Sequence, residues 1–192
     1  MPEDHSSHPG ILLSFDLPAE CYAADVRAIA ARTIQLFGLR EWKAVVLTGE
    51  IHGHLGIYST IGAKMGVYAR ELFEAEGLGG DISVVTYAGS KPPVSCLNDG
   101  LQVACGASVG HGLIEVSEDE RKWACALFCC SGRKIKLHLR KEYEDAVKSD
   151  IAAARAAFGL SPGYWSRIRD LAVKYWSTWD RNEIFNSCEP GA

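Results

Sequence analysis

The spacing of apolar residues changes along this chain, and the order of the changes limits the folds that it can adopt. Apolar residues recur at helical spacing in 18–37 and again in 55–76, which predicts two amphipathic helices. Gly62 and Gly66 lie four positions apart in the second of these. Because glycine weakens a helix by about 1 kcal/mol relative to alanine, the pair indicates close approach of another backbone.

Short apolar runs, which are typical of strands, follow the second helix. The predicted strands are 81–88, 113–116, 122–130 and 134–139. The turn between the last two predicts a hairpin, and a short helix is expected at 95–105. The run at 44–48 is rich in β-branched residues, which favours a strand or an extended buried segment.

The last part of the chain returns to helical spacing. Helices are expected at 140–158 and 163–179, followed by an irregular tail. The resulting order is helix, strand, helix and three strands, which predicts an α+β fold with a mixed sheet and extra helices at both ends. We expect one domain over 1–192, with its core at about 44–140 and a helical extension over 140–192.

The composition excludes several classes of protein. The 192 residues carry a formal net charge of -4, which argues against a nucleic-acid partner, and no apolar stretch is long enough to span a membrane. The polar first ten residues do not resemble a signal peptide, which predicts a cytoplasmic location. Seven cysteines without a CxxC pair then indicate reduced thiols rather than a disulfide framework.

The first segment whose side chains could bind a metal or take part in a reaction is His52-Gly53-His54, before the second helix. Imidazole binds transition metals and also titrates near neutral pH. The intervening glycine allows a sharp bend, so that both rings can approach one centre. Alternatively, one histidine caps a helix and the other is solvated.

The second segment runs from Ser95 to Gly100, after two prolines. Cys96 is expected at a helix N-terminus, where the helix dipole favours the thiolate. Asp99 lies one turn later on the same side, so Cys96, His54 and Asp99 form a candidate catalytic group. The alternative is a buried free cysteine beside an aspartate that complements the dipole.

The third segment is a glycine-rich loop over 106–112, whose backbone N–H groups could line a ligand. Its candidate cofactor-binding residues are Gly106, Ser108, Gly110 and His111. The spacing does not match a nucleotide-binding loop, and a glycine-rich turn is the alternative.

Other cysteines and aromatic residues favour packing. Cys129 and Cys130 are adjacent in a predicted strand and point to opposite faces, while Cys125 is expected in the core. The roles of Cys105 and Cys188 stay open. The aromatic residues of 163–179 predict a docking face for the helix, and they include Trp165, Tyr175, Trp176 and Trp179.

Taken in order, these segments resemble the FmdE family, also called FwdE, which is associated with formylmethanofuran dehydrogenase. The family pattern begins with His-Gly-His and an apolar residue, continues through a glycine-containing helix and then has a Ser-Cys-x-x-Asp-Gly-x-Gln segment. A glycine-rich loop and a lysine before a hairpin follow. The matching residues here are His52 to Leu55, Gly62, Met65, Gly66, Ser95, Cys96, Asp99, Gly100, Gln102, Gly106, Ser108, Gly110, Gly112 and Lys122.

The resemblance, which covers about 50–140, implies a core like the second domain of glyceraldehyde-phosphate dehydrogenase. It also implies a shared metal site formed by His52, His54 and Cys96. Many relatives have a cysteine where this chain has Gly56, so one thiolate ligand is missing. The C-terminal zinc ribbon of many relatives is also absent.

Three functions are consistent with this sequence. The first is a metal-binding protein that carries out metal-assisted chemistry on a small molecule, with zinc favoured and iron, cobalt or nickel as alternatives. The second is an accessory subunit or a metal or cofactor carrier of a molybdenum or tungsten oxidoreductase, working as a homodimer or with partner subunits. The third is a thiol enzyme that depends on Cys96.

Overall fold

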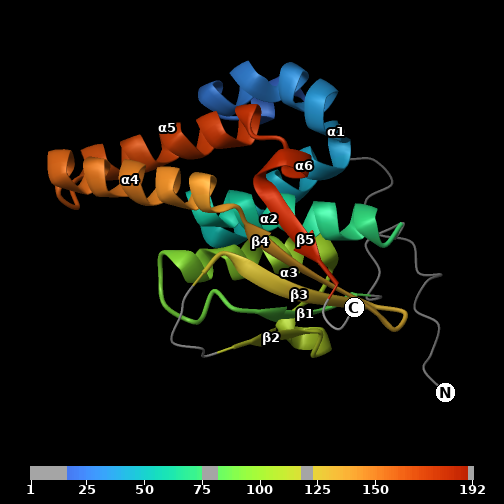
Figure 1. Cartoon of the computed structure of the whole chain (residues 1–192). Coiled ribbons are helices and arrows are strands. Elements are labelled where there is room, and N and C mark those ends of the chain that lie inside the picture. The colour runs from blue at the N-terminus through green and yellow to red at the C-terminus, as the bar shows by residue number, and fades with distance from the viewer. Residues whose placement is uncertain (1–16, 75–81, 118–122, 190–192) are drawn as a thin grey trace.

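Helices and a mixed sheet form two layers in a computed structural model, which describes residues 17–74, 82–117 and 123–189 (Figure 1). This confirms the predicted α+β class. The helices are α1 (Ala24–His52), α2 (Ile57–Leu72), α3 (Leu97–Cys105), α4 (Lys141–Phe158), α5 (Pro162–Thr178) and α6 (Arg181–Ile184). The strands are β1 (Ile82–Thr86), β2 (Ile114–Val116), β3 (Cys125–Cys130), β4 (Arg133–Leu139) and β5 (Phe185–Cys188).

The strand order in the sheet is β2-β1-β3-β4-β5. Strands β1 and β2 run parallel and the other neighbours run antiparallel, so the sheet is mixed. The predicted hairpin between β3 and β4 is confirmed. The expectation of an irregular tail is wrong, because Leu139 of β4 pairs with Phe185, and β5 completes the edge of the sheet. A strand of four residues is too short for the alternation of apolar and polar residues to identify it in the sequence.

Residues 24–52 form the helix α1, which corrects two expectations. The helix predicted for 18–37 does not stop at Gly38: the chain breaks there, with a φ of 85°, and then resumes as the second half of α1. The run at 44–48 lies in this half and is not a strand. Trp42, Val45 and Thr48 are buried at a spacing of three, and Trp42 stacks on Trp176 at 4.3 Å between ring centroids. Tertiary packing therefore overrides the β-propensity of the run.

Close packing of α2 against α3 confirms the role predicted for the helix glycines. A Cβ atom on Gly62 would lie 2.1 Å from the carbonyl oxygen of Leu97, and one on Gly66 would lie 2.6 Å from Cβ of Ala104. On the facing helix, a Cβ on Gly100 would lie 2.3 Å from the backbone of Ala63. Since no side chain fits at these positions, glycine on both helices sets the distance between them.

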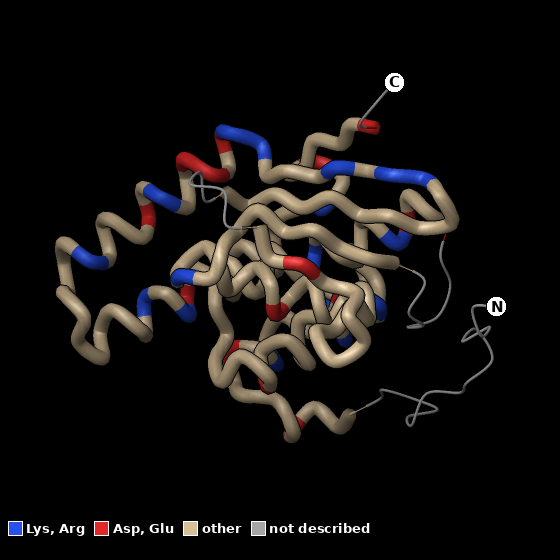
Figure 2. Tube along the Cα trace, turned by 90° about the horizontal axis from the view of Figure 1, so that it is seen from below, with Lys and Arg blue, Asp and Glu red and all other residues tan. Residues whose placement is uncertain are grey.

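The core lies between the sheet and the helices, all of which lie on one face of the sheet (Figure 1). Alternate strand residues such as Val84, Phe128 and Leu137 are buried against α2 and α3, while Val85 and Leu127 face the other way and are half-buried. The alternation also separates Cys129 from Cys130, as predicted. The central strands β1 and β3 carry no charged residue, as the view from the sheet side shows (Figure 2).

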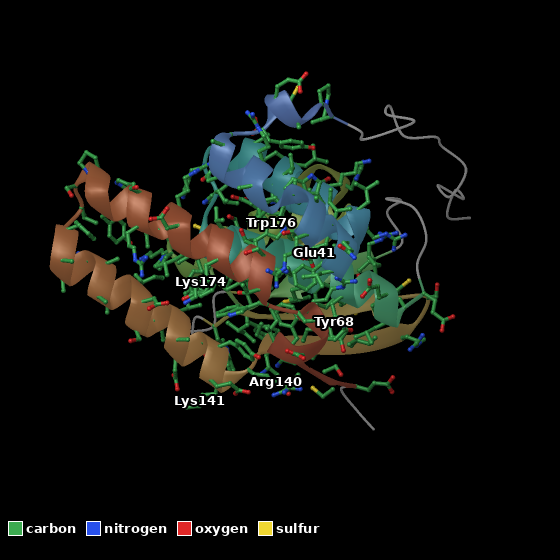
Figure 3. The ribbon with its side chains drawn as sticks, turned by 90° about the horizontal axis from the view of Figure 1, so that it is seen from above. Glu41, Tyr68, Arg140, Lys141, Lys174 and Trp176 are labelled. Atoms are coloured by element: carbon green, nitrogen blue, oxygen red, sulfur yellow. The ribbon has the colours of Figure 1, made fainter. Side chains whose placement is uncertain are left out.

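A buried ion-pair network joins the helices behind the sheet. Nζ of Lys64 in α2 lies 2.5 Å from a carboxylate oxygen of Glu41 in α1, and both side chains are almost fully buried (Figure 3). Arg181 donates to the other oxygen of Glu41 at 3.1 Å and to Glu71 at 2.6 Å. Because each buried charge has a partner, the network fixes α1, α2 and α6 relative to one another.

Candidate functional site

The two histidines of the His-Gly-His segment lie beside one another where α1 ends and α2 begins. His52 is the last residue of α1, and Gly53 adopts a left-handed conformation with a φ of 79°. This reverses the chain and places the ring of His54 4.4 Å from that of His52, measured between centroids. The two imidazoles therefore lie close together, while their approach to one shared centre stays a prediction.

His52 is held by a carboxylate from a distant part of the chain. Its Nδ1 lies 2.7 Å from Oδ2 of Asp99, and the side chains are 12% and 33% exposed, respectively. Its other nitrogen, Nε2, is buried and has no hydrogen-bond partner among the described residues. A Cβ on residue 56 would lie 3.3 Å from that nitrogen, so a side chain there would crowd Nε2.

The glycine contacts between α2 and α3 explain how this pair forms. They bring the start of α3 against the first turns of α2, because Gly100 packs on Ser59 and Ala63. Asp99 precedes Gly100, and its carboxylate reaches His52 at the end of α1. The helix packing thus positions the charged partner of the histidine.

The electrostatic surroundings of Cys96 differ from the expectation for a helix N-terminus. Cys96 is half-buried directly before α3. Burial raises the pKa of its thiol, and the nearby charge of Asp99 raises it further. Desolvation and the neighbouring carboxylate thus oppose the thiolate that the position at a helix N-terminus was expected to favour.

His54 is shifted toward its neutral form. Partial burial lowers the pKa of the imidazole, and the adjacent His52 lowers it further. A neutral imidazole keeps a lone pair available for a metal or a proton near pH 7. Within the described residues, no three His, Cys, Asp or Glu side chains are arranged so that they could hold a metal ion as they stand. The imidazole pair nevertheless has the chemistry of metal donors, since the two rings lie side by side and Nε2 of His52 has no partner among the described residues.

The glycine-rich loop follows the C-terminal end of α3, while Cys96 and Asp99 lie at its beginning. A helix of nine residues is roughly 13 Å long, so the structure places His111 apart from the other two histidines. The Ser108 hydroxyl accepts a hydrogen bond from the backbone N–H of His111, and the Gln102 side chain accepts one from Val109. The loop thus satisfies some of its own backbone donors, and a role in cofactor binding stays a prediction.

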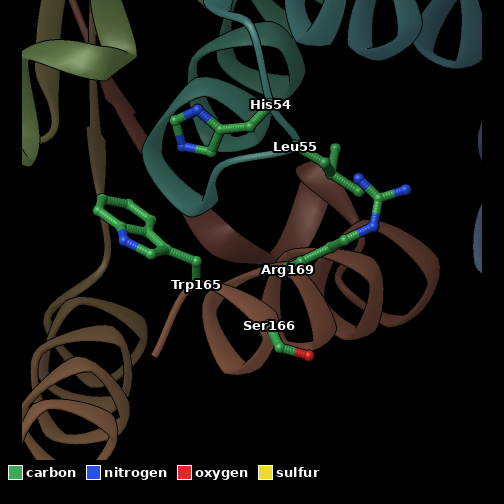
Figure 4. A pocket seen from close by; sticks show the side chains of 5 residues that line it. All are labelled: His54, Leu55, Trp165, Ser166 and Arg169. Atoms are coloured by element: carbon green, nitrogen blue, oxygen red, sulfur yellow. The ribbon is translucent and has the colours of Figure 1, made fainter. Parts of the chain in front are cut away.

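A pocket of about 570 Å³ opens beside His54, and the sequence did not predict it (Figure 4). Its lining residues are His54, Leu55, Trp165, Ser166 and Arg169. The docking face predicted for this helix includes Trp165. Tyr175 and Trp176 are buried as predicted, whereas Trp165 is 53% exposed. No sequence signal relates α5 to the histidines, because helix packing alone brings them together.

The remaining cysteines take different positions. All seven are free; Cys105 and Cys125 are buried, and burial raises their pKa values to about 12 and about 11. Cys188 lies exposed in β5 rather than in an irregular tail. Lys122 of the predicted family pattern lies outside the described residues.

The fold and the site together define a class: an α+β protein in which two histidines lie side by side and an aspartate of a glycine-packed helix holds the first of them. Residues 51–186 match the family described as FmdE, molybdenum formylmethanofuran dehydrogenase operon, and the chain belongs to this family. The match extends past residue 140, where the recognisable motifs end, and reaches the first residues of β5. A search of curated proteins found no match. None of the described helices combines the length and apolar character needed to span a membrane.

Proposed function

We propose that this protein binds a divalent transition metal through His52, His54 and Cys96, and that Asp99 orients His52. The observation that carries the proposal is the buried, unpartnered Nε2 of His52, whose ring is held from its other side by Asp99. Histidine ligands of metals commonly donate their second N–H to a carboxylate, which fixes the tautomer and leaves the other nitrogen free to bind. A side chain at residue 56 would crowd that nitrogen, and glycine avoids this.

The donor set favours zinc, with iron, cobalt or nickel as alternatives. Two imidazoles and one thiolate suit zinc, and three protein ligands leave a coordination position free for water or substrate. A metal in such a site supplies a Lewis acid and lowers the pKa of bound water to about 7. His54 and Cys96 would have to turn toward Nε2 of His52, because these side chains do not form a ligand group as they stand.

An accessory role in an oxidoreductase assembly is the second candidate, and two observations favour it. The family description refers to the operon of a molybdenum formylmethanofuran dehydrogenase. In addition, the described helices cover one face of the sheet, while the other face presents half-buried apolar residues such as Val85 and Leu127. The partners that we propose for this face are a second copy of the chain or a component of the oxidoreductase.

Metal-free thiol catalysis by Cys96 is the weakest candidate. Such an enzyme needs a thiolate near neutral pH, and the raised pKa of Cys96 opposes it. Binding to a metal would deprotonate the same thiol, so the raised pKa is compatible with a ligand role.

The proposal is tested by elemental mass spectrometry of untagged protein purified anaerobically. We expect about one metal ion per chain in the wild type and after reconstitution with Zn²⁺. The variants His52→Ala, His54→Ala and Cys96→Ser should each lose most of this metal, because three ligands cannot be reduced to two without a large loss of affinity.

His111→Ala and Cys188→Ser serve as matched controls, since they remove an exposed imidazole and an exposed thiol elsewhere. Both should retain the metal. A wild type that binds no Zn²⁺ on addition would refute the proposal. The accessory role would then be tested by measuring the mass of the assembly in solution.

A further inference from the structure

We propose that the pocket beside His54 binds a small aromatic carboxylate, with its ring against Trp165 and its carboxylate at Arg169. This inference names a substrate class for the site, and it rests on the proposed function for the part that His54 plays in any reaction. The ligand contacts that define the proposal come from Trp165 and Arg169 of α5, which are not among the proposed metal ligands. The two proposals can therefore fail separately.

The first observation is the exposure of Trp165. The indole is 53% exposed, whereas Tyr175 and Trp176 on the same helix are 2% and 1% exposed. The indole makes edge-to-face contacts with Tyr164 at 5.1 Å and with His54 at 5.8 Å between ring centroids. These contacts fix its orientation, so it presents a flat surface to the pocket. An aromatic ring that stacks on the open indole would bury apolar area and gain the preference of aromatic pairs.

The second observation is the guanidinium of Arg169, which lies in the same pocket (Figure 4). Asp25 of α1 holds it with two hydrogen bonds, from Nε at 2.6 Å and from Nη2 at 3.0 Å. A guanidinium has five N–H donors, so three remain beyond these two bonds. Planar donors of this kind are suited to a carboxylate. The charge of Asp25 nearby disfavours a dianion such as a phosphate ester, which is why we specify a carboxylate.

The position of the pocket links the ligand to the histidines. His54 forms part of the wall and lies beside His52, so a ligand seated on Trp165 has His54 within the same cavity. Leu55 adds an apolar surface and Ser166 a hydroxyl group. A volume of about 570 Å³ is within the range of small-molecule sites.

The test is ligand-observed NMR on the full chain, with benzoate as the probe. Benzamide has the same shape without the charge, and cyclohexanecarboxylate has the charge without the flat ring. We expect benzoate to bind more tightly than either, by about 3- to 10-fold. Trp165→Ala should weaken benzoate by a similar factor, and Trp165→Phe should restore part of the affinity.

The ion pair provides a matched comparison. Arg169→Gln and Asp25→Asn both break the contact between α1 and α5, yet only the first removes the cation. We expect Arg169→Gln to abolish the preference for benzoate over benzamide and Asp25→Asn to retain or strengthen it. Circular dichroism and thermal melting establish that each variant is folded.

Three results would overturn the inference: benzoate binds no better than benzamide, Trp165→Ala binds it as well as the wild type, or Asp25→Asn and Arg169→Gln weaken it equally. Zinc binding is measured on the same samples. Normal zinc binding alongside failed benzoate binding would refute this inference alone. Normal benzoate binding in a chain that takes up no zinc would refute the metal proposal alone.

Discussion

Nδ1 of His52 lies 2.7 Å from Oδ2 of Asp99, although the two residues are 47 positions apart. The contact joins the end of α1 to the first turn of α3. It also determines which nitrogen of the imidazole is left for other chemistry, because Nδ1 is engaged and Nε2 has no partner in the described part of the chain. Both the proposed metal site and the environment of Cys96 depend on this relationship.

Removing the carboxylate should weaken metal binding without removing a ligand. For Asp99→Ala we expect the affinity for Zn²⁺ to fall by about 10- to 100-fold, because the ring of His52 loses its fixed orientation. Competition with a chromophoric chelator measures the change. Asp145→Ala removes an exposed carboxylate that pairs with Lys141 within α4 and should have no effect. Equal affinities in the wild type and Asp99→Ala would contradict an orienting role.

His54 should titrate below the usual histidine range. Its pKa is lowered from 6.5 by partial burial and by His52, so NMR titration of its ring protons should show a midpoint below that value. The unfolded chain binds this proton more readily than the folded one. The contribution to stability is therefore present above pH 6.5 and is lost as the pH falls through the folded pKa. In His52→Asn the midpoint should rise, and an unchanged midpoint would argue against coupling of the rings.

Cys96 should react slowly with alkylating agents at neutral pH. Burial and the charge of Asp99 raise its pKa, so little thiolate is present. Peptide mapping after brief treatment with iodoacetamide should show less modification at Cys96 than at the exposed Cys21. Asp99→Asn should speed the reaction of Cys96 and leave Cys21 unchanged. Rapid modification of Cys96 in the wild type would revive the thiol-enzyme hypothesis.

The glycine contact between α2 and α3 should be intolerant of a methyl group. In Gly100→Ala the new Cβ would lie 2.3 Å from the backbone of Ser59 and Ala63, which cannot move away easily. We expect a loss of at least about 1–3 kcal/mol in the free energy of unfolding, measured with urea. Gly49→Ala is the control, because its Cβ meets nothing within 4 Å in α1. It should raise stability by up to about 1 kcal/mol.

The buried pair of Lys64 and Glu41 should show strong coupling. Lys64→Met leaves Glu41 with Arg181 alone, and Glu41→Leu leaves the Lys64 ammonium with only the carbonyl oxygen of Trp179. Each change removes the direct partner of a buried charge and should cost up to about 3–5 kcal/mol. The double variant removes both charges and should recover most of the loss, since an apolar pair of similar volume needs no compensation. A double-mutant cycle by urea unfolding provides the measurement, and additive losses would show that the contact contributes little.

The sequence predicted those features that depend on local patterning. Apolar periodicity located α2, α3 and the hairpin of β3 and β4, because an amphipathic element records in its spacing which side faces the core. The ordered motifs around His52, Cys96 and Gly100 indicated the family. Gly62 and Gly66 predicted a close helix contact, since a glycine inside a helix carries a cost that packing must offset.

Other features were decided by tertiary structure. The run at 44–48 has strand propensity, but Val45 is buried and the nearby Trp42 stacks on Trp176 of α5. That burial outweighs a preference of less than about 1 kcal/mol per residue. Likewise, β5 forms because an edge of β4 is available to it. Local sequence therefore determined which residues could carry chemistry. Only the packing of α5 and α3 onto the end of α1 decided which of these residues lie together. Contacts between residues far apart in the sequence produce no periodic pattern from which they could be predicted.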